Sequence, residues 1–222
     1  MKNLKLKDRF FRGAVGDNSF VNGKLTEEGF KLYDQLSKNE VTKYDKYLKN
    51  NRGKESYIIT QGEKGMKQKK EWILFYDNIF TGLTIVSDYY QLEGFYPFRL
   101  DKDEYIPEFK KLVDLVHKNG ANFFMQLVHI GMNVMTKPET VYGPSSLPIP
   151  NQNRFSKEMT KEDILRIEND FAEAALRAKK AGYDGVEIHG AHFYLISDFY
   201  LLYLIKELMN IEEVMKIEQD FY

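Results

Sequence analysis

The sequence predicts an α/β protein with a parallel sheet. Between residues 103 and 190, segments with helical spacing of apolar residues alternate with short apolar runs, and the joints between them are short. An order of helix, strand, helix and strand with short joints is typical of parallel βα units, whose crossovers are right-handed. Open doubly wound sheets and (β/α) barrels both fit this order.

The N-terminal region supplies the first elements. DRFFRGAVG (8–16) suits a first strand, TEEGFKLYDQLSKN (26–39) a first helix, and WILFYDNIFTGLTIVS (72–87) a second strand that runs into a loop. Residues 42–71 are lysine-rich and show no sustained periodicity. Because long structureless segments are uncommon inside a compact βα series, we interpret this segment as an insertion.

The next unit is more regular. In residues 103–120 the apolar residues recur at helical spacing, Pro107 lies in the first turn, and Gly120 stands where a C-terminal cap belongs. ANFFMQLVHIG (121–131) is a nearly continuous apolar run. Such a run predicts a strand that is buried on both faces.

A third helix and a fourth strand follow. Thr160 and Asp163 resemble a capping box before an apolar stripe, and Gly182 is expected to end the helix. GVEIHG (185–190) then predicts a short strand. The count is therefore four strands and three helices.

Composition narrows the classes of partner. The 32 Lys and Arg residues nearly cancel the 33 Asp and Glu residues, so we expect neither nucleic acid nor an acidic membrane as partner. With no cysteine, disulfides, Cys-type zinc sites and thiol nucleophiles are excluded. No apolar run approaches ~18 residues and no signal peptide is evident. We expect a soluble cytoplasmic protein that acts on a small-molecule substrate.

The strand ends carry the candidate site residues. In a barrel, groups at the C-terminal ends of the strands converge on one mouth. No G-x-G-x-x-G follows the first strand, which removes the usual dinucleotide fingerprint. The groups at these ends are mostly small or uncharged, as suits a flat, neutral ligand. They are Ala14 to Gly16, Thr81 with Gly82, Gln126 with His129, and His189 with His192.

Other interpretations of these residues stay open on the sequence alone. His189 and His192 could bind zinc together with His129 or Glu187, although the spacing matches no common zinc signature. They could also be satisfied polar groups at a strand end. Gln126 could bond only to backbone.

Several motifs together resemble the Old Yellow Enzyme family of NADH:flavin oxidoreductases. They are QLVHIG (126–131), GPSSL (143–147) and above all AGYDGVEIHGAHFYLIS (181–197). LKDRFFRGAVGD and TGLTIVSDYYQ extend the similarity, which covers residues 1–41 and about 75–199. The resemblance implies a TIM (β/α)8 barrel that holds FMN at its mouth and passes electrons from NAD(P)H to activated alkenes or similar acceptors. This chain would supply the N-terminal half of that barrel, about four βα units.

The resemblance also implies contacts with the flavin. Ala14 and Val15 would lie against it, and Gly82 would approach it from the second strand. Gln126 would bond to the pyrimidine edge of the isoalloxazine. No metal site is implied.

The resemblance implies catalytic roles for three further residues. His189 and His192 would donate hydrogen bonds to the carbonyl oxygen of the substrate, and Tyr194 would deliver a proton as hydride leaves the flavin. The chemistry agrees, since hydride addition beside a carbonyl develops an enolate that two preorganised donors stabilise. A phenol with an ordinary pKa of ~10 stays protonated at neutral pH and can act as a general acid.

The sequence departs from the family pattern at several positions. Met132 stands where the family favours Arg, Asp8 where Asn is usual, and Phe193 where Gly is usual. A side chain at position 193 could disturb the turn if φ is positive there.

The last 23 residues, 200–222, do not continue the family pattern. Their amphipathic spacing would pass as an ordinary helix. The third base of each codon can instead be read with the first two bases of the next codon, from Phe199 onward. With A/T-rich synonymous codons, this shifted frame permits most of the family's next segment, L-S-P-L-x-N-K-R-T-D-E-Y-x-G-S. We therefore expect residues 1–199 to form a half-barrel and residues 200–222 to be a frame-displaced tail.

A half-barrel has physical consequences for function. The FMN phosphate site of the family lies on strands that this chain would lack, so the resemblance implies weak flavin binding. Two unpaired sheet edges also favour self-association. The alternative to an active oxidoreductase is therefore an inactive, truncated remnant without stable flavin binding.

Overall fold

The computed structural model describes residues 12–14, 19–21, 24–38, 78–87, 98–134, 138–149 and 151–208, with residues 204–208 described as backbone only. The predicted insertion at 42–71 lies outside these residues, as does the tail beyond residue 208.

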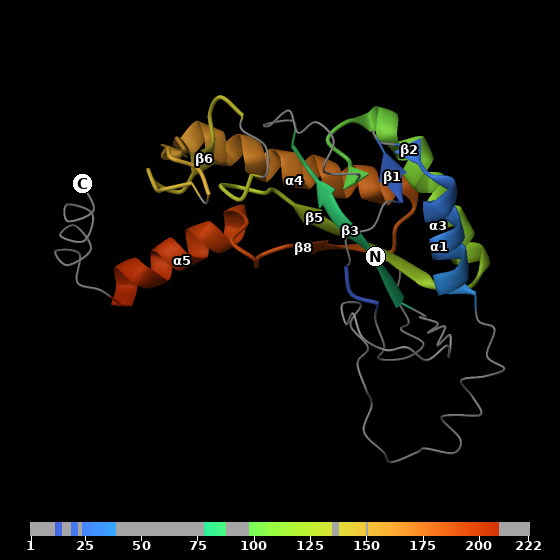
Figure 1. Cartoon of the computed structure of the whole chain (residues 1–222). Helices are drawn as coiled ribbons and strands as arrows, with labels where there is room; N and C mark the ends of the chain where they lie inside the picture. Colours follow the sequence, from blue (N-terminus) through green and yellow to red (C-terminus); the bar gives the residue numbers. More distant parts are fainter. Residues whose placement is uncertain are drawn as a thin grey trace, which may run out of the picture.

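The central sheet consists of parallel strands in the order β4-β3-β5-β8 (Figure 1). β3 (Asn78–Ile85) pairs with β5 (Asn122–Val128), and β5 pairs with β8 (Gly185–Ile188). The short β4 (Phe98–Arg99), which the sequence did not predict, pairs with the opposite edge of β3.

The predicted first strand is described only at residues 12–14. Arg12 forms a parallel bridge to Ile79 in β3. Its backbone N–H donates to the Asn78 carbonyl at 2.9 Å, and its carbonyl accepts from the Phe80 N–H at 3.0 Å. Since β5 occupies the other edge of β3, this segment lies where the first strand of a sequential parallel sheet belongs.

Three helices follow the strands and cover one face of the sheet (Figure 1). They are α1 (Glu27–Ser37), α3 (Ile106–Lys118) and α4 (Lys161–Ala181), and α3 packs between the other two. A doubly wound sheet carries helices on both faces and reverses its strand order. Sequential parallel strands with all helices on one face form an arc of a (β/α)8 barrel, so the predicted half-barrel fold is confirmed.

The helix boundaries follow from local sequence. Thr26 accepts a hydrogen bond from the Gly29 N–H at the start of α1. Thr160 and Asp163 form the predicted capping box of α4, with both reciprocal bonds present. Gly182 ends α4 at a φ of 101°, in the left-handed region that glycine enters without steric cost.

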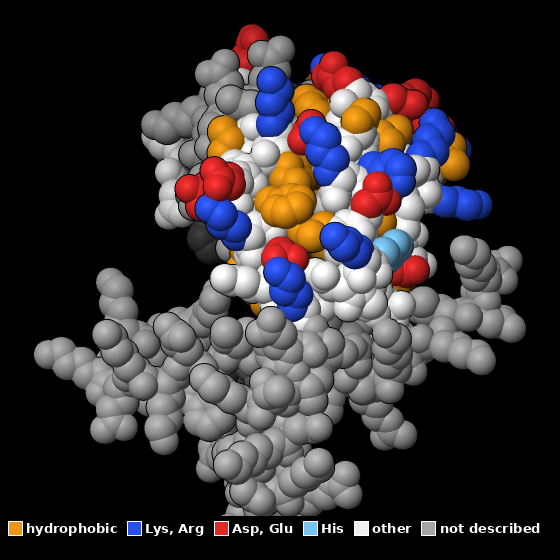
Figure 2. All heavy atoms as spheres, turned by 90° about the vertical axis from the view of Figure 1, so that its right-hand side faces the viewer, with side chains coloured by type: hydrophobic (Ala, Val, Ile, Leu, Met, Phe, Trp, Pro, Cys, Tyr) orange, Lys and Arg blue, Asp and Glu red, His pale blue; other side chains and the backbone are white. Residues whose placement is uncertain are grey.

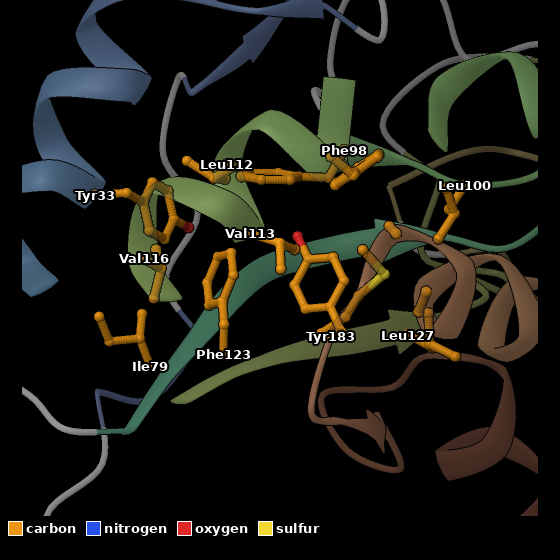
Figure 3. Packing of buried hydrophobic residues seen from close by; sticks show 14 of the residues in the cluster. Tyr33, Ile79, Phe98, Leu100, Leu112, Val113, Val116, Phe123, Leu127 and Tyr183 are labelled. Atoms are coloured by element: carbon orange, nitrogen blue, oxygen red, sulfur yellow. The ribbon is translucent and has the colours of Figure 1, made fainter. Parts of the chain in front are cut away.

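The main core lies between the sheet and these helices. Alternate residues of β5, namely Phe123, Met125 and Leu127, are fully buried within it. Figure 3 shows Phe123 beside Tyr183, and their ring centroids lie 4.8 Å apart. Burying each such side chain contributes about 1.5–3 kcal/mol. Because Gln126 and Val128 on the other face of β5 are buried too, the prediction of a strand buried on both faces is confirmed.

Smaller elements complete the described part of the chain. β1 (Phe20–Val21) and β2 (Lys24–Leu25) form an antiparallel hairpin, while β6 (Tyr142–Gly143) and β7 (Lys157–Glu158) pair in parallel. α3 is preceded by a 3₁₀ turn, η1 (Asp103–Tyr105).

The final helix, α5 (Leu195–Leu208), leads away from the sheet (Figure 1). Its first turn packs through Leu195 against Ile167 of α4. It leaves the outer face of β8 uncovered, where Val186 is 39% and Ile188 57% exposed. None of the described helices is long and apolar enough to cross a membrane.

The solvent-facing side of the helices carries charges of both signs. Figure 2 shows lysine and arginine side chains interleaved with acidic ones over the side of the molecule formed by α1 and α3. Several of these charges pair within a helix, as Lys31 does with Glu27 and Lys110 with Asp114. This surface therefore has no continuous positive patch that would attract a polyanion.

Candidate active site

A tight turn follows β8 and carries the predicted catalytic residues. The His189 N–H donates to the Leu127 carbonyl at 2.9 Å, which fixes the end of the strand. The turn from Ala191 to Tyr194 is closed by a 3.2 Å bond from the Tyr194 N–H to the Ala191 carbonyl. His192 and Phe193 have φ values of 59° and 55°, the signs required at the two central positions of a type I′ turn. Phe193 therefore adopts the positive φ that a glycine would favour.

The turn brings His189, His192 and Tyr194 together. His189 Nε2 lies 3.1 Å from His192 Nδ1, within hydrogen-bond distance. The Tyr194 ring centroid is 5.1 Å from that of His189 and 6.5 Å from that of His192. His189 is buried at 8% exposure, Tyr194 is half-buried and His192 is exposed. The convergence that the sequence predicted for these three side chains is present.

The bond between the imidazoles restricts their protonation. When both rings are neutral, one of the facing nitrogens carries the proton and the other accepts it, so both rings hold the same tautomer. Only one outward ring N–H then remains between His189 and His192 to bond a ligand. One added proton would supply a second outward donor without breaking the bond between the rings.

The surroundings of the cluster favour a neutral His189 imidazole and a protonated Tyr194 phenol. Burial lowers the pKa of His189, the neighbouring His192 lowers it further, and Glu187 opposes the change. Burial raises the pKa of Tyr194 above its usual value of 10.0. Tyr194 therefore holds its proton at neutral pH, as a general acid must.

The predicted flavin contacts lie on neighbouring strands. Gly82 is buried in β3 at a break in the register with β5, between Phe80 and Leu83. Gln126 follows on β5, and its backbone N–H donates to Thr81 Oγ1 at 3.3 Å. Ala14 is half-buried, two residues after the bridge at Arg12, while Val15 lies outside the described residues.

The Gln126 carboxamide has a partner that the sequence did not identify. Its Nε2 donates to Glu187 Oε2 on β8 at 2.9 Å, and the two residues are aligned across the strands. The interpretation that Gln126 bonds only to backbone is therefore wrong. A primary amide has two N–H groups and a carbonyl oxygen. One N–H and the oxygen remain for the alternating donors and acceptors of a flavin pyrimidine edge, so Gln126 fits the group that the family resemblance implies.

Two further polar residues near the turn are buried: His129, which the sequence placed at the end of a strand, and Asp198, which the sequence did not single out. His129 is 4% exposed, and burial lowers its pKa to about 3. Asp198, in the first turn of α5, is 7% exposed, and burial raises its pKa to about 7. The only sequence signal for Asp198 is an acidic residue inside an otherwise apolar run.

The zinc interpretation finds no support in the geometry. Within the residues that the structure describes, no three His, Asp or Glu side chains lie together in a group that could hold a metal ion. His117, on α3, is exposed and lies within hydrogen-bond distance of Asp184 Oδ2, at 2.9 Å.

Known proteins resemble both the sequence and the fold. The NADH:flavin oxidoreductase / NADH oxidase family model matches residues 97–207, half of the chain. An NADPH dehydrogenase of Listeria monocytogenes serotype 4a (strain HCC23) is 43% identical over 97 residues, which are 44% of this chain and 28% of that protein. An NADH oxidase of Thermoanaerobacter brockii is 40% identical over 104 residues, 46% of this chain and 16% of that protein.

A solved structure agrees with these sequence matches. Histamine dehydrogenase from Rhizobium sp. 4-9 superimposes with a TM-score of 0.51 and 30% sequence identity, over 60% of this chain and 21% of that one. The chain thus spans less than a third of the length of the curated relatives named above. The matched region contains β5, α4, β8 and the His189–Tyr194 turn, and it confirms the family resemblance. The chain belongs to the NADH:flavin oxidoreductase / NADH oxidase family.

Proposed function

We propose that this chain carries the acceptor site of an FMN-dependent NAD(P)H oxidoreductase of Old Yellow Enzyme type, which acts in the cytoplasm on an activated alkene or a similar acceptor. The observation that carries the proposal is the convergence of His189, His192 and Tyr194 at the C-terminal end of β8. Family membership supports flavin chemistry in general. The named acceptor class rests on the chemistry of these three side chains.

When bound, FMN would take electrons from NAD(P)H and pass them as hydride to the acceptor. Ala14, Val15, Gly82 and Gln126 are the residues of this chain that would hold its ring. The Gln126 amide is already oriented by Glu187, at 2.9 Å. Because this bond fixes the amide, its second N–H and its oxygen would bond the ring with little rearrangement.

The histidines would bind the carbonyl oxygen of the acceptor. Negative charge grows on that oxygen as the alkene is reduced, and an imidazole N–H that already points there stabilises it without rearrangement. The turn holds the His192 ring against His189, with His192 Nδ1 3.1 Å from His189 Nε2, so the two side chains lie side by side at the end of β8. One neutral pair supplies a single outward donor, and a pair with one added proton supplies two.

Tyr194 would complete the reaction as the proton donor. Its phenol stays protonated because burial raises its pKa. The hydroxyl would release its proton to the carbon next to the acceptor carbonyl, which converts the enolate into the saturated ketone. Solvent would then return a proton to the phenolate.

The substitution Tyr194→Phe tests this role because it removes the hydroxyl and keeps the ring. We expect alkene reduction to slow by about 10²–10⁴-fold, the usual contribution of a general acid. Flavin reduction by NAD(P)H should be unchanged, since it needs no proton from Tyr194. Rapid-mixing measurements of the two half-reactions separate these rates, and an equal loss in both would rule out Tyr194 as the proton donor.

A second candidate function is a catalytically inactive chain that does not hold flavin stably. The exposure of Val186 and Ile188 favours it, because these apolar residues of an edge strand lack cover in the described part of the chain. Such an edge also favours self-association. Equilibrium dialysis against FMN distinguishes the candidates: stoichiometric binding supports the oxidoreductase, and no retention supports the inactive chain. Sedimentation of the same sample reports the association.

A further inference from the structure

The turn that presents the catalytic residues is conformationally unfavourable. His192 and Phe193 both have positive φ values, 59° and 55°. Side chains with a Cβ avoid this region, and large ones such as phenylalanine do so strongly. Strained backbone of this kind persists only where neighbouring groups impose it, and it concentrates at functional sites.

The loop after β5 holds the turn from both sides. The Asn133 Nδ2 donates to the carbonyl oxygen of His192 at 3.3 Å. The Leu195 N–H donates to the His129 carbonyl at 3.1 Å. Gly131 lies so close that a Cβ on it would be 2.8 Å from backbone atoms of Leu195. Loop and turn therefore form one packed unit.

The bond from Asn133 acts on the central peptide of the turn. The His192 carbonyl belongs to the peptide group between the two central residues. If this group rotates by half a turn, a type I′ turn becomes type II′, in which only the first central residue keeps a positive φ. The rotation would relieve Phe193, and the Asn133 side chain opposes it by bonding the oxygen that has to move.

We propose that Asn133 is a positioning residue, which locks the strained His192–Phe193 peptide so that the His192 ring faces His189. The functional importance of this alignment rests on the proposed function, but the alignment itself can be measured without flavin. Loss of one hydrogen bond changes an equilibrium constant by about tenfold. Such a change is enough to shift a turn whose competing form relieves the strain at Phe193.

The substitution Phe193→Gly provides a specific rescue. Glycine adopts a positive φ as readily as a negative one, so it removes the advantage of the rotated peptide. The effect of Asn133→Ala should therefore be large when Phe193 is present and small when glycine replaces it. A residue that only adds general stability would show the same effect in both backgrounds.

The experiment measures the tautomer and hydrogen bonding of the two imidazoles by long-range ¹H–¹⁵N NMR. It uses the whole chain at about pH 8, where ordinary histidines are neutral. In the parent chain we expect His189 and His192 to show one shared tautomer and a hydrogen-bonded Nδ1–Nε2 pair. Asn133→Ala should abolish that pattern, and Asn133→Ala combined with Phe193→Gly should restore it. Asn153→Ala, at an exposed asparagine outside the β5 loop, should leave it unchanged.

Two outcomes would overturn the proposal. The first is an unchanged imidazole pattern in Asn133→Ala. The second is an equal loss of the imidazole pattern in Asn133→Ala and in the double variant. This comparison still tests the proposal if Asn133→Ala alone folds poorly, because Phe193→Gly should then restore the pattern. The NMR experiment requires neither FMN nor turnover. If the chain proves inactive, the proposed function is refuted, but the role of Asn133 in the turn can still be tested.

Discussion

Asp198 couples the stability of the site to pH in a way that a single substitution should reveal. Its side chain is 7% exposed, and its Oδ2 has no hydrogen-bond partner in the described part of the chain. A hydrogen bond from the Met132 backbone lowers its pKa, but burial outweighs this and raises the pKa from 3.8 to about 7. Between about pH 4 and pH 7, the folded chain therefore keeps a proton on Asp198 that the unfolded chain has already released.

The sign and size of the effect follow from this difference. A carboxyl whose pKa is raised on folding contributes stability that is full below its unfolded pKa and is lost as pH rises through its folded pKa. At about 1.4 kcal/mol for each pKa unit, the shift of Asp198 corresponds to an upper limit of about 4 kcal/mol. About 3 kcal/mol of this should be lost between pH 5 and pH 8.

Asp198→Asn isolates this contribution because asparagine keeps the shape and an oxygen for the Met132 N–H but never ionises. We expect the variant to match the parent below about pH 4, and its advantage in stability to grow by a further ~3 kcal/mol between pH 5 and pH 8. Urea denaturation at several pH values gives the free energies of unfolding. The difference between variant and parent cancels the opposing titration of His129, whose pKa burial lowers to about 3.

Asp114→Asn is the matched control, since Asp114 is exposed on α3 and pairs with Lys110. It should shift stability by less than about 0.5 kcal/mol at every pH. A constant difference between Asp198→Asn and the parent from pH 5 to pH 8 would show that Asp198 is not held neutral by burial.

Two further substitutions test the packing of the main core and of the loop beside the site. Tyr183→Phe removes a buried hydroxyl that has no hydrogen-bond partner among the described residues, so thermal or urea unfolding should show a gain of about 1 kcal/mol; a clear loss would mean that the hydroxyl is bonded. Gly131→Ala adds a Cβ at a φ of 59° and 2.8 Å from the Leu195 backbone, and should cost more than about 2 kcal/mol. Gly13→Ala is its control, because no atom of the described residues lies within 4 Å of the added Cβ; equal losses in the two variants would refute the close approach.

The sequence was most informative where a local pattern and the tertiary structure impose the same requirement. The apolar run around Phe123 and Met125 predicted a strand buried on both faces because both sides of β5 are covered. Thr160, Asp163 and Gly182 predicted the ends of α4 because capping depends on neighbours in the chain. The turn with His189, His192 and Tyr194 was predictable because one short segment contains all three residues.

Contacts between distant segments could not be predicted in this way. The pairing of Gln126 with Glu187 depends on the register of β5 against β8, which no local pattern specifies. The bond from Asn133 to His192 depends on how two loops meet. Burial of Asp198 likewise depends on the packing of α5 against the β5 loop. β4 escaped prediction because two residues are too few to show a period.

The central claim, that the His189–Tyr194 turn forms the acceptor site of a flavin oxidoreductase, is tested most directly by one rate. Chemically reduced FMN is mixed with the chain and an α,β-unsaturated ketone without oxygen, and flavin reoxidation is followed by absorbance. We predict a saturable acceleration over free reduced FMN that is lost when His189 and His192 are both replaced by alanine. A rate equal to that of free flavin, or an acceleration that survives both replacements, would contradict the claim.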